Sequence, residues 1–189
     1  MQTTWMAALL ALIAVGHSPV LAADDVLDAI DKGRKAYQAG DLGTAKQSLD
    51  LASQLIGQKN AEAFGALMPK PLAGWTADDV QTTAVGSTAY GASMATRTYR
   101  NAKDESVEVQ ITGDSAAVAQ LAPILTNPQI AGAMGKIVRV GSLSAIQTPQ
   151  GDVQMIVANK FLVSVVGSAP AAAKLAYAQA VDVAKLSKM

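Results

Sequence analysis

Apolar residues recur at helical spacing in the part of the chain that follows residue 23. Two stripes are present, the first made of Val26, Leu27 and Ile30, and the second of Leu42, Ala45, Leu49, Ala52 and Ile56. Intervals of three and four residues place side chains on one side of an α-helix. Gly40 and Asp41 separate the stripes and are typical turn residues. The pattern therefore predicts a helical hairpin over residues 24–67.

Beyond Asp79 the apolar period changes to two residues, which indicates β-strands. The predicted strands cover residues 80–85, 94–100, 107–111, 136–140, 142–148, 153–158 and 161–167. Helical segments are predicted at residues 114–125, 130–134 and 170–186. Residues 111–122 resemble residues 165–176, which makes a duplicated unit of three strands and one helix possible. We therefore expect an α+β fold, in which an antiparallel sheet has its helices packed on one face.

A connector is predicted between the hairpin and the sheet. Pro69 and Pro71 cannot continue a helix, and Gly74 permits a tight turn. The predicted organisation is residues 1–23 as a signal peptide, 24–67 as the helical hairpin, 68–78 as the connector and 79–189 as the α+β domain.

The first 23 residues have the pattern of a secretory signal. They contain no charged side chain, and residues 6–15 form an unbroken run of ten apolar residues, which is too short to cross a bilayer. Ala22 and Ala23 supply the small residues that signal peptidase requires. We expect cleavage after one of these two residues, and a periplasmic or secreted protein with no membrane span. The alternative is an uncleaved anchor.

The composition narrows the chemistry that the exported chain can perform. The 189 residues include no Cys and one His, and Lys plus Arg balance Asp plus Glu at 15 each. The one His is His17, which cleavage would remove. Without His or Cys, catalytic triads, thiolate chemistry and imidazole or thiolate zinc sites are excluded. The balanced charge gives no support to nucleic-acid binding. We therefore assign no catalytic residue, no metal site and no cofactor.

One segment of the hairpin carries the spacing of a known repeat. Its small residues are Gly33, Ala45 and Ala52, at separations of twelve and seven positions. With the turn at Gly40 and Asp41, residues 33–56 resemble a single tetratricopeptide repeat. The resemblance implies contact with another protein, and a hairpin that packs only within its own chain is the alternative. The candidate partner-surface residues are Tyr37, Leu42 and Leu49.

Two further resemblances concern the rest of the chain. The run from Pro69 to Trp75 has the form Pro-x-Pro-Leu-x-Gly-Trp and resembles a segment that opens the α+β domain of uncharacterised exported bacterial proteins. The predicted strand order is similar to that of the PsbP-like group. Neither resemblance implies an activity.

Arg97 and Trp75 are the candidate ligand-binding residues. If the turn after Asn101 pairs Tyr99 with Val107, Arg97 lies on the core side of the sheet. A guanidinium there must meet a carboxylate, reach solvent at the sheet edge or bind an anionic ligand. A register slip of one residue would turn Arg97 outward. Trp75 is expected to be buried against the sheet, with stacking on a ligand as the alternative.

These observations favour an exported, non-catalytic binding or accessory protein of the bacterial cell envelope that contacts another protein. A small hydrolase or lyase that uses Asp, Glu, Lys or Tyr is the alternative from a different class, and a role in envelope assembly is a third. A polar pocket with two carboxylates would favour the enzyme. An exposed apolar stripe on the hairpin would favour the binding protein.

Overall fold

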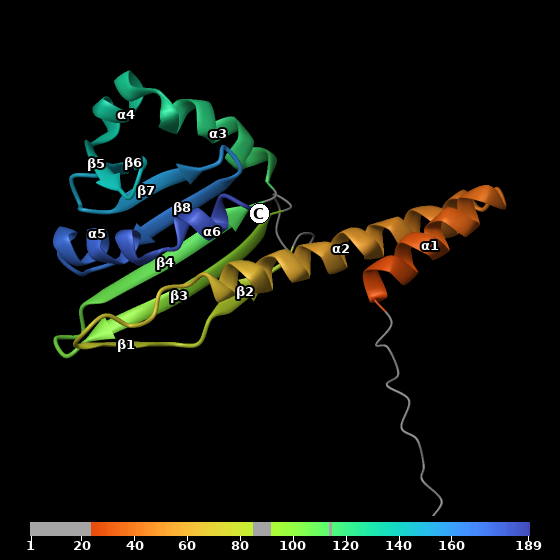
Figure 1. Ribbon diagram of the computed structural model, residues 1–189, viewed down its shortest axis with the longest axis horizontal. Coiled ribbons are helices and arrows are strands. Elements are labelled where there is room, and N and C mark those ends of the chain that lie inside the picture. The colour runs from red at the N-terminus through yellow and green to blue at the C-terminus, as the bar shows by residue number, and fades with distance from the viewer. Residues whose placement is uncertain (1–23, 85–91, 114) are drawn as a thin grey trace, which may run out of the picture.

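The computed structural model describes residues 24–84, 92–113 and 115–189 (Figure 1). Its helices are α1 (Asp25–Gln38), α2 (Leu42–Ala66), α3 (Ala116–Thr126), α4 (Pro128–Met134), α5 (Ala171–Ala180) and α6 (Val183–Leu186). Its strands are β1 (Trp75–Ala77), β2 (Gln81–Thr83), β3 (Ser93–Asn101), β4 (Ser106–Gly113), β5 (Lys136–Val140), β6 (Leu143–Gln147), β7 (Val153–Val157) and β8 (Phe161–Val166). The predicted signal peptide lies outside the described residues. Within them, no helix has both the length and the apolar composition needed to span a membrane.

The helical hairpin forms where the sequence predicts it, and its ends have local causes. The Asp24 carboxylate accepts a hydrogen bond from the Val26 N–H at 3.0 Å. The Asp41 carboxylate accepts one from the Thr44 N–H at 3.0 Å. These caps satisfy N–H groups that have no partner within the first helical turn. Between the helices Gly40 has a φ of 80°, a conformation that a Cβ disfavours.

Small residues allow the two helices of the hairpin to approach closely. Buried small residues in α1 and the first half of α2 are Ala29, Gly33, Ala45, Ser48 and Ala52. A Cβ on Gly33 would lie 3.1 Å from Leu49 Cγ, closer than an ordinary van der Waals contact. The small positions of the predicted repeat are therefore buried positions of the hairpin.

The sheet is antiparallel throughout its described strand pairs, as predicted. Its strand order is β1-β3-β4-β8-β7-β6-β5, and β2 pairs with β3 next to β1. The predicted register between β3 and β4 is confirmed, because Tyr99 pairs with Val107 and Arg97 pairs with Val109. This register places alternate residues of each strand on a common face.

The main core lies on one face of the sheet. Its central residues are Val107, Val109 and Ile111 of β4 and Val163 and Val165 of β8, each at most 1% exposed. They are alternate residues of their strands and therefore point to the same side. Tyr177 of α5 and Phe64 of α2 belong to the same core. The C-terminal end of the hairpin and the C-terminal helices thus cover this face.

The opposite face is covered by α3, so the α+β class is as predicted but the expectation that the helices pack on one face is wrong. Val118 and Ala122 of α3 pack against Ile156 and Leu162, which lie opposite each other in the β7–β8 pair. Residues 155–157 of β7 are all buried. A strand with apolar residues on both sides needs cover on both faces. Strand alternation alone does not say which helix supplies it.

The connector contributes directly to the sheet. Trp75–Ala77 form β1, which pairs with the end of β3, and Met68 belongs to the main core. A strand of three residues contains too few positions to show a period of two. The prediction of a connector over residues 68–78 therefore missed this strand.

The predicted C-terminal helix is divided in two. Between α5 and α6, Val181 is extended with a ψ of 130°, and its side chain is buried in the main core. The Asp182 carboxylate then accepts a hydrogen bond from the Lys185 N–H at 3.0 Å and caps α6. The break lets both α5 and Leu186 of α6 reach the core.

Tyr99 is fully buried in the main core. Its hydroxyl donates a hydrogen bond to the Pro69 carbonyl at 2.7 Å, and its ring centre lies 4.3 Å from that of Tyr177. Burial raises the pKa of Tyr99 to about 12, and the nearby Arg97 charge opposes this increase. Burial also raises the pKa of Tyr177. The folded state therefore favours the neutral form of both phenols.

We expect the protein to lose stability as the pH rises from about 10 to about 12. The unfolded chain releases the Tyr99 proton near pH 10, whereas the folded chain holds it until about pH 12. In this range the folded state binds more protons, so the free energy of unfolding falls by about 1.4 kcal/mol per pH unit for this group. Urea unfolding at about pH 8, 10 and 11 measures the slope. Tyr99→Phe should reduce it and Tyr37→Phe, at an exposed Tyr, should not; equal slopes in all three proteins would contradict the assignment.

Candidate functional site

The hairpin is attached to the sheet at one end and projects from it at the other (Figure 1). The Ser93 hydroxyl donates a hydrogen bond to the Gly57 carbonyl at 3.1 Å. The Phe64 ring packs edge-on against Phe161, with 5.5 Å between ring centres. These contacts hold the second half of α2 on the sheet, whereas α1 packs against α2. Part of the hairpin thus packs within its own chain, and α1 with the start of α2 extends beyond the sheet.

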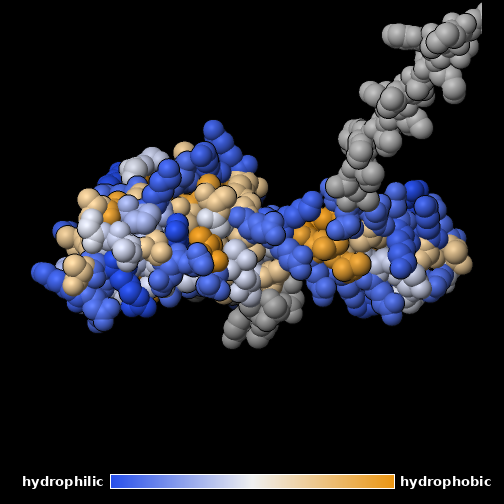
Figure 2. Space-filling view, turned by 90° about the horizontal axis from the view of Figure 1, so that it is seen from below, coloured by the Kyte–Doolittle hydropathy of each residue, from blue (hydrophilic) through white to orange (hydrophobic). Residues whose placement is uncertain are grey.

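Large apolar side chains are exposed along the hairpin, most of them on its projecting part. They are Leu27, Ile30, Tyr37, Leu42, Leu49 and Ile56, which we call the hairpin face. Tyr37 is 69% exposed, Leu42 65% and Leu49 50%, so the three surface residues predicted from the sequence are accessible. Figure 2 shows apolar residues gathered on the surface of the hairpin.

Helix geometry explains why the three residues of α2 share one side of that helix. Leu42, Leu49 and Ile56 follow one another at seven-residue intervals, which is two helical turns. Leu51, two positions after Leu49, points to the other side of α2 and lines a shallow depression with Lys32 of α1. Leu51 is 49% exposed, nearly the same as Leu49. The two leucines therefore differ in direction and not in accessibility.

Three ion pairs lie on the surface of the hairpin. Their nitrogen–oxygen distances are 3.1 Å for Arg34 and Asp31, 2.6 Å for Lys46 and Asp50, and 3.4 Å for Lys59 and Asp24. All six side chains are exposed, and such pairs contribute at most about 1 kcal/mol each. Apolar contact is therefore the main interaction that the hairpin face offers.

Arg97 lies on the core side of the sheet, as the predicted register requires. Its Nε donates a hydrogen bond to the Asp78 carbonyl at 2.9 Å, and a terminal guanidinium nitrogen donates to the Pro69 carbonyl at 3.5 Å. The guanidinium carbon lies 5.7 Å from the centre of the Tyr99 ring. The sequence analysis expected a carboxylate, solvent or an anionic ligand as the partner of Arg97, and it did not consider backbone carbonyls. These carbonyls reach Arg97 only in the folded connector. Arg97 holds the connector on the sheet, and its role toward an anionic ligand stays a prediction.

Trp75 is half-buried, whereas the sequence predicted burial. It lies in β1 at the edge of the sheet, where its ring packs edge-on against Tyr177 with 5.4 Å between ring centres. Tyr177 also stacks on Tyr99, the residue that Arg97 contacts. The structure thus brings the two candidate ligand residues to one cluster around two tyrosines. Stacking of Trp75 on a ligand stays a prediction.

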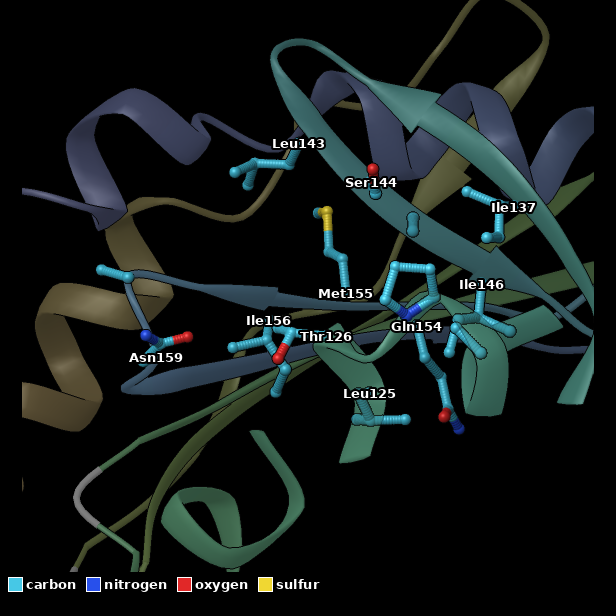
Figure 3. Close-up of a pocket in the computed structure, with 14 residues that line it drawn as sticks. Leu125, Thr126, Ile137, Leu143, Ser144, Ile146, Gln154, Met155, Ile156 and Asn159 are labelled. Carbon is cyan, nitrogen blue, oxygen red and sulfur yellow. The ribbon is translucent and has the colours of Figure 1, made fainter. Parts of the chain in front are cut away.

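A cavity that the sequence analysis missed lies between the sheet and the helices α3 and α4 (Figure 3). Its volume is about 350 Å³. The residues that line it are Leu125, Thr126, Pro128, Ala131, Ile137, Leu143, Ser144, Ala145, Ile146, Gln154, Met155, Ile156, Ala158 and Asn159. None of these side chains carries a charge. The one sequence signal for a site here was the unbroken apolar run at residues 155–157, which indicates a strand covered on both faces.

Among the described residues, no group of three or more His, Cys, Asp or Glu side chains is placed to hold a metal ion. Comparisons with known protein families, with curated proteins and with solved structures found no match. The structure therefore defines the class of this protein by itself, as an α+β protein with a projecting helical hairpin.

Proposed function

We propose that this protein is an exported, non-catalytic binding protein of the bacterial cell envelope that contacts another protein through the hairpin face. The observation that carries the proposal is the exposure of large apolar side chains on a helical pair that extends beyond the sheet. Exposed apolar residues that gather on one surface mark interaction sites. The assignment to the envelope rests on the signal pattern of residues 1–23.

The partner segment that fits this face best is an amphipathic helix of the other protein. Leu42, Leu49 and Ile56 have the seven-residue interval of coiled coils, in which one helix packs its side chains between those of another. Helices bind apolar grooves through residues at the same spacing.

The resemblance to a tetratricopeptide repeat supports the same proposal. The small residues that carry it, Gly33, Ala45 and Ala52, are buried in the hairpin. Repeats of this kind stack on neighbouring units, because a single one cannot bury all of its apolar surface. In this chain the sheet covers one end of α2, and the hairpin face is left for a partner. We also propose that the strand order is similar to that of the PsbP-like group. This similarity does not imply an activity.

Two open depressions on the hairpin contain carboxylates, Asp28 and Asp31 in one and Asp24, Asp25 and Glu62 in the other, but all of these side chains are exposed to solvent. The alternative of a small hydrolase or lyase is therefore less well supported. Its distinguishing feature would be a polar pocket with two carboxylates. The cavity beside α3 and α4 is lined mostly by apolar residues, and its lining includes no Asp, Glu, Lys or Tyr. We therefore carry the binding proposal alone.

Leu49 and Leu51 form a matched pair that tests the proposal. A photoreactive amino acid at position 49 of the full-length, exported chain should crosslink to one envelope protein in intact cells, and the same substitution at position 51 should not. Leu49→Asp should weaken binding of that protein by at least about tenfold, because a carboxylate would be buried in an apolar contact. Leu51→Asp should leave binding unchanged, since its side chain points away from the hairpin face.

Light scattering during size-exclusion chromatography examines the other possible occupant, a second copy of this chain. A concentration-dependent dimer that Leu49→Asp abolishes would overturn the assignment to a different protein. Equal crosslinking at both positions, or none at either, would contradict the hairpin face as a binding surface.

A further inference from the structure

Strands β6 and β7 separate after a short region of pairing. The two paired positions are Ile146 with Gln154 and Gln147 with Val153. On either side, β5 pairs with β6 and β7 pairs with β8 over five positions each. The residues that would continue the β6–β7 pairing, 143–145 and 155–157, are therefore not paired with each other. We call this opening in the sheet the β6–β7 gap.

The cavity described above lies at the β6–β7 gap. Met155 points from β7 toward Leu143 and Ser144 of β6 (Figure 3). The other walls come from the end of α3, from α4 and from the turn between β7 and β8. A volume of about 350 Å³ corresponds to about twelve water molecules and falls in the range of small-molecule sites. The strand separation thus creates a space of ligand size.

Four polar side chains line this otherwise apolar cavity, and they have hydrogen-bonding capacity left. The Thr126 hydroxyl donates to the Ala122 carbonyl at 2.7 Å and can still accept a hydrogen bond. Within the described part of the chain, the side chains of Ser144, Gln154 and Asn159 make no hydrogen bond. Strand edges without a neighbouring strand also present backbone N–H and C=O groups. The cavity therefore offers both donors and acceptors beside its apolar walls.

We propose that the β6–β7 gap binds a small uncharged molecule that has an apolar body and a hydroxyl or amide group. The apolar walls take the body, and the polar side chains that line the cavity, Gln154 among them, are the candidates to hydrogen-bond its polar group. A charged molecule does not fit, because no lining side chain carries a compensating charge and an unpaired charge is strongly disfavoured away from water. The site shares no residue with the hairpin face, so the two proposals are independent.

Three probes with the same alkyl chain and different head groups test the proposal. They are octan-1-ol, octanoate and octylammonium, added to the exported chain labelled with ¹³C at its methionine methyl groups. Octan-1-ol should shift the Met155 methyl signal in a saturable way, with a Kd at least about tenfold lower than that of either charged probe. Met155→Leu identifies the signal. No saturable shift with octan-1-ol, or octanoate binding as tight as octan-1-ol, would overturn the proposal.

Two variants and one matched control locate the binding. Ile137→Trp should abolish binding of octan-1-ol, because Ile137 lines the cavity and a larger side chain there would fill it. Ile137 is 45% exposed, so the fold should accommodate the larger side chain. Ile130→Trp is the control, since Ile130 is 41% exposed but does not line the cavity. Gln154→Leu should weaken binding about fivefold through loss of one hydrogen bond.

Undiminished octan-1-ol binding in both Ile137→Trp and Gln154→Leu would place the probe elsewhere and contradict the site. Leu49→Asp should bind octan-1-ol like the unmodified protein. A failure of the hairpin proposal is therefore distinguishable from a failure of this one.

Discussion

Replacing Lys174 with Met is expected to lower the free energy of unfolding by about 3–5 kcal/mol. The Lys174 side chain is 2% exposed, and its Nζ donates hydrogen bonds to three oxygens. These are the Asp152 carboxylate at 2.7 Å, the Gln150 carbonyl at 2.7 Å and the Gly167 carbonyl at 3.1 Å. Met is unbranched and apolar like the Lys stem, so the loss reports the charge and its hydrogen bonds. The variant leaves a partly buried carboxylate without its cation, and this is the main cause of the loss.

Lys185→Met is the control for this prediction. Lys185 also pairs with an Asp, at 3.5 Å from Asp182, but its side chain is 73% exposed. Exposed pairs contribute at most about 1 kcal/mol, so this variant should remain close to the unmodified protein in urea unfolding. If Lys174→Met costs as little as Lys185→Met, the Lys174 interactions do not stabilise the fold as argued.

The Lys174 contacts also explain how the C-terminal helix is positioned. Through one ammonium group, α5 is joined to the turn between β6 and β7 and to the residue after β8. The same turn joins β6 to β7 at the end where the two strands are paired, and the β6–β7 gap opens at their other end. An Ala-rich helix has little side-chain surface of its own, and a buried Lys supplies directional contacts that alanines cannot.

Replacing Phe64 with Ala is the second change for which we expect a large effect, a loss of about 3–5 kcal/mol. Phe64 is 1% exposed and packs edge-on against Phe161. A Cβ on Gly113 would lie 2.7 Å from both rings, which shows how little free space surrounds them. The Ala variant therefore leaves a cavity between α2 and the sheet, and the neighbouring groups have limited means to fill it.

Phe64→Ala should also raise amide hydrogen exchange in the second half of α2, since this ring is a main contact between the hairpin and the sheet. Leu51→Ala, at a half-exposed position of the same helix, should change stability by less than about 1 kcal/mol. Urea unfolding by circular dichroism measures both losses. A small loss for Phe64→Ala with unchanged exchange would show that other contacts hold the hairpin.

The pairing of β3 with β4 shows how much of a strand register can be predicted from the local sequence pattern. The alternation of Val107, Val109 and Ile111, together with a short turn after Asn101, predicted two registers that differ by one residue, and the structure has the one that places Arg97 opposite Val109. What Arg97 contacts could not be predicted in the same way. Its acceptors are the carbonyls of Asp78 and Pro69, which reach it only when the connector folds back over the sheet.

The two candidate binding sites also differ in how far they could be predicted from the sequence. Tyr37, Leu42 and Leu49 could be selected from the sequence because they lie in the segment that resembles a tetratricopeptide repeat, and because helical period places Leu42 and Leu49 on one side of a helix. The cavity at the β6–β7 gap could not, because its walls come from α3, α4 and three strands. No period within any one of these segments indicates where two strands separate.

The sequence by itself determined the two-helix hairpin, most strand positions and the antiparallel hairpin of β3 and β4. These features depend on residues a few positions apart, through helical period, strand alternation and turn residues. Only the tertiary structure decided that α3 covers the second face, that residues 75–77 join the sheet and that β6 and β7 part. Each of these depends on contacts between distant segments, and the free energy of such contacts is not encoded in any local pattern.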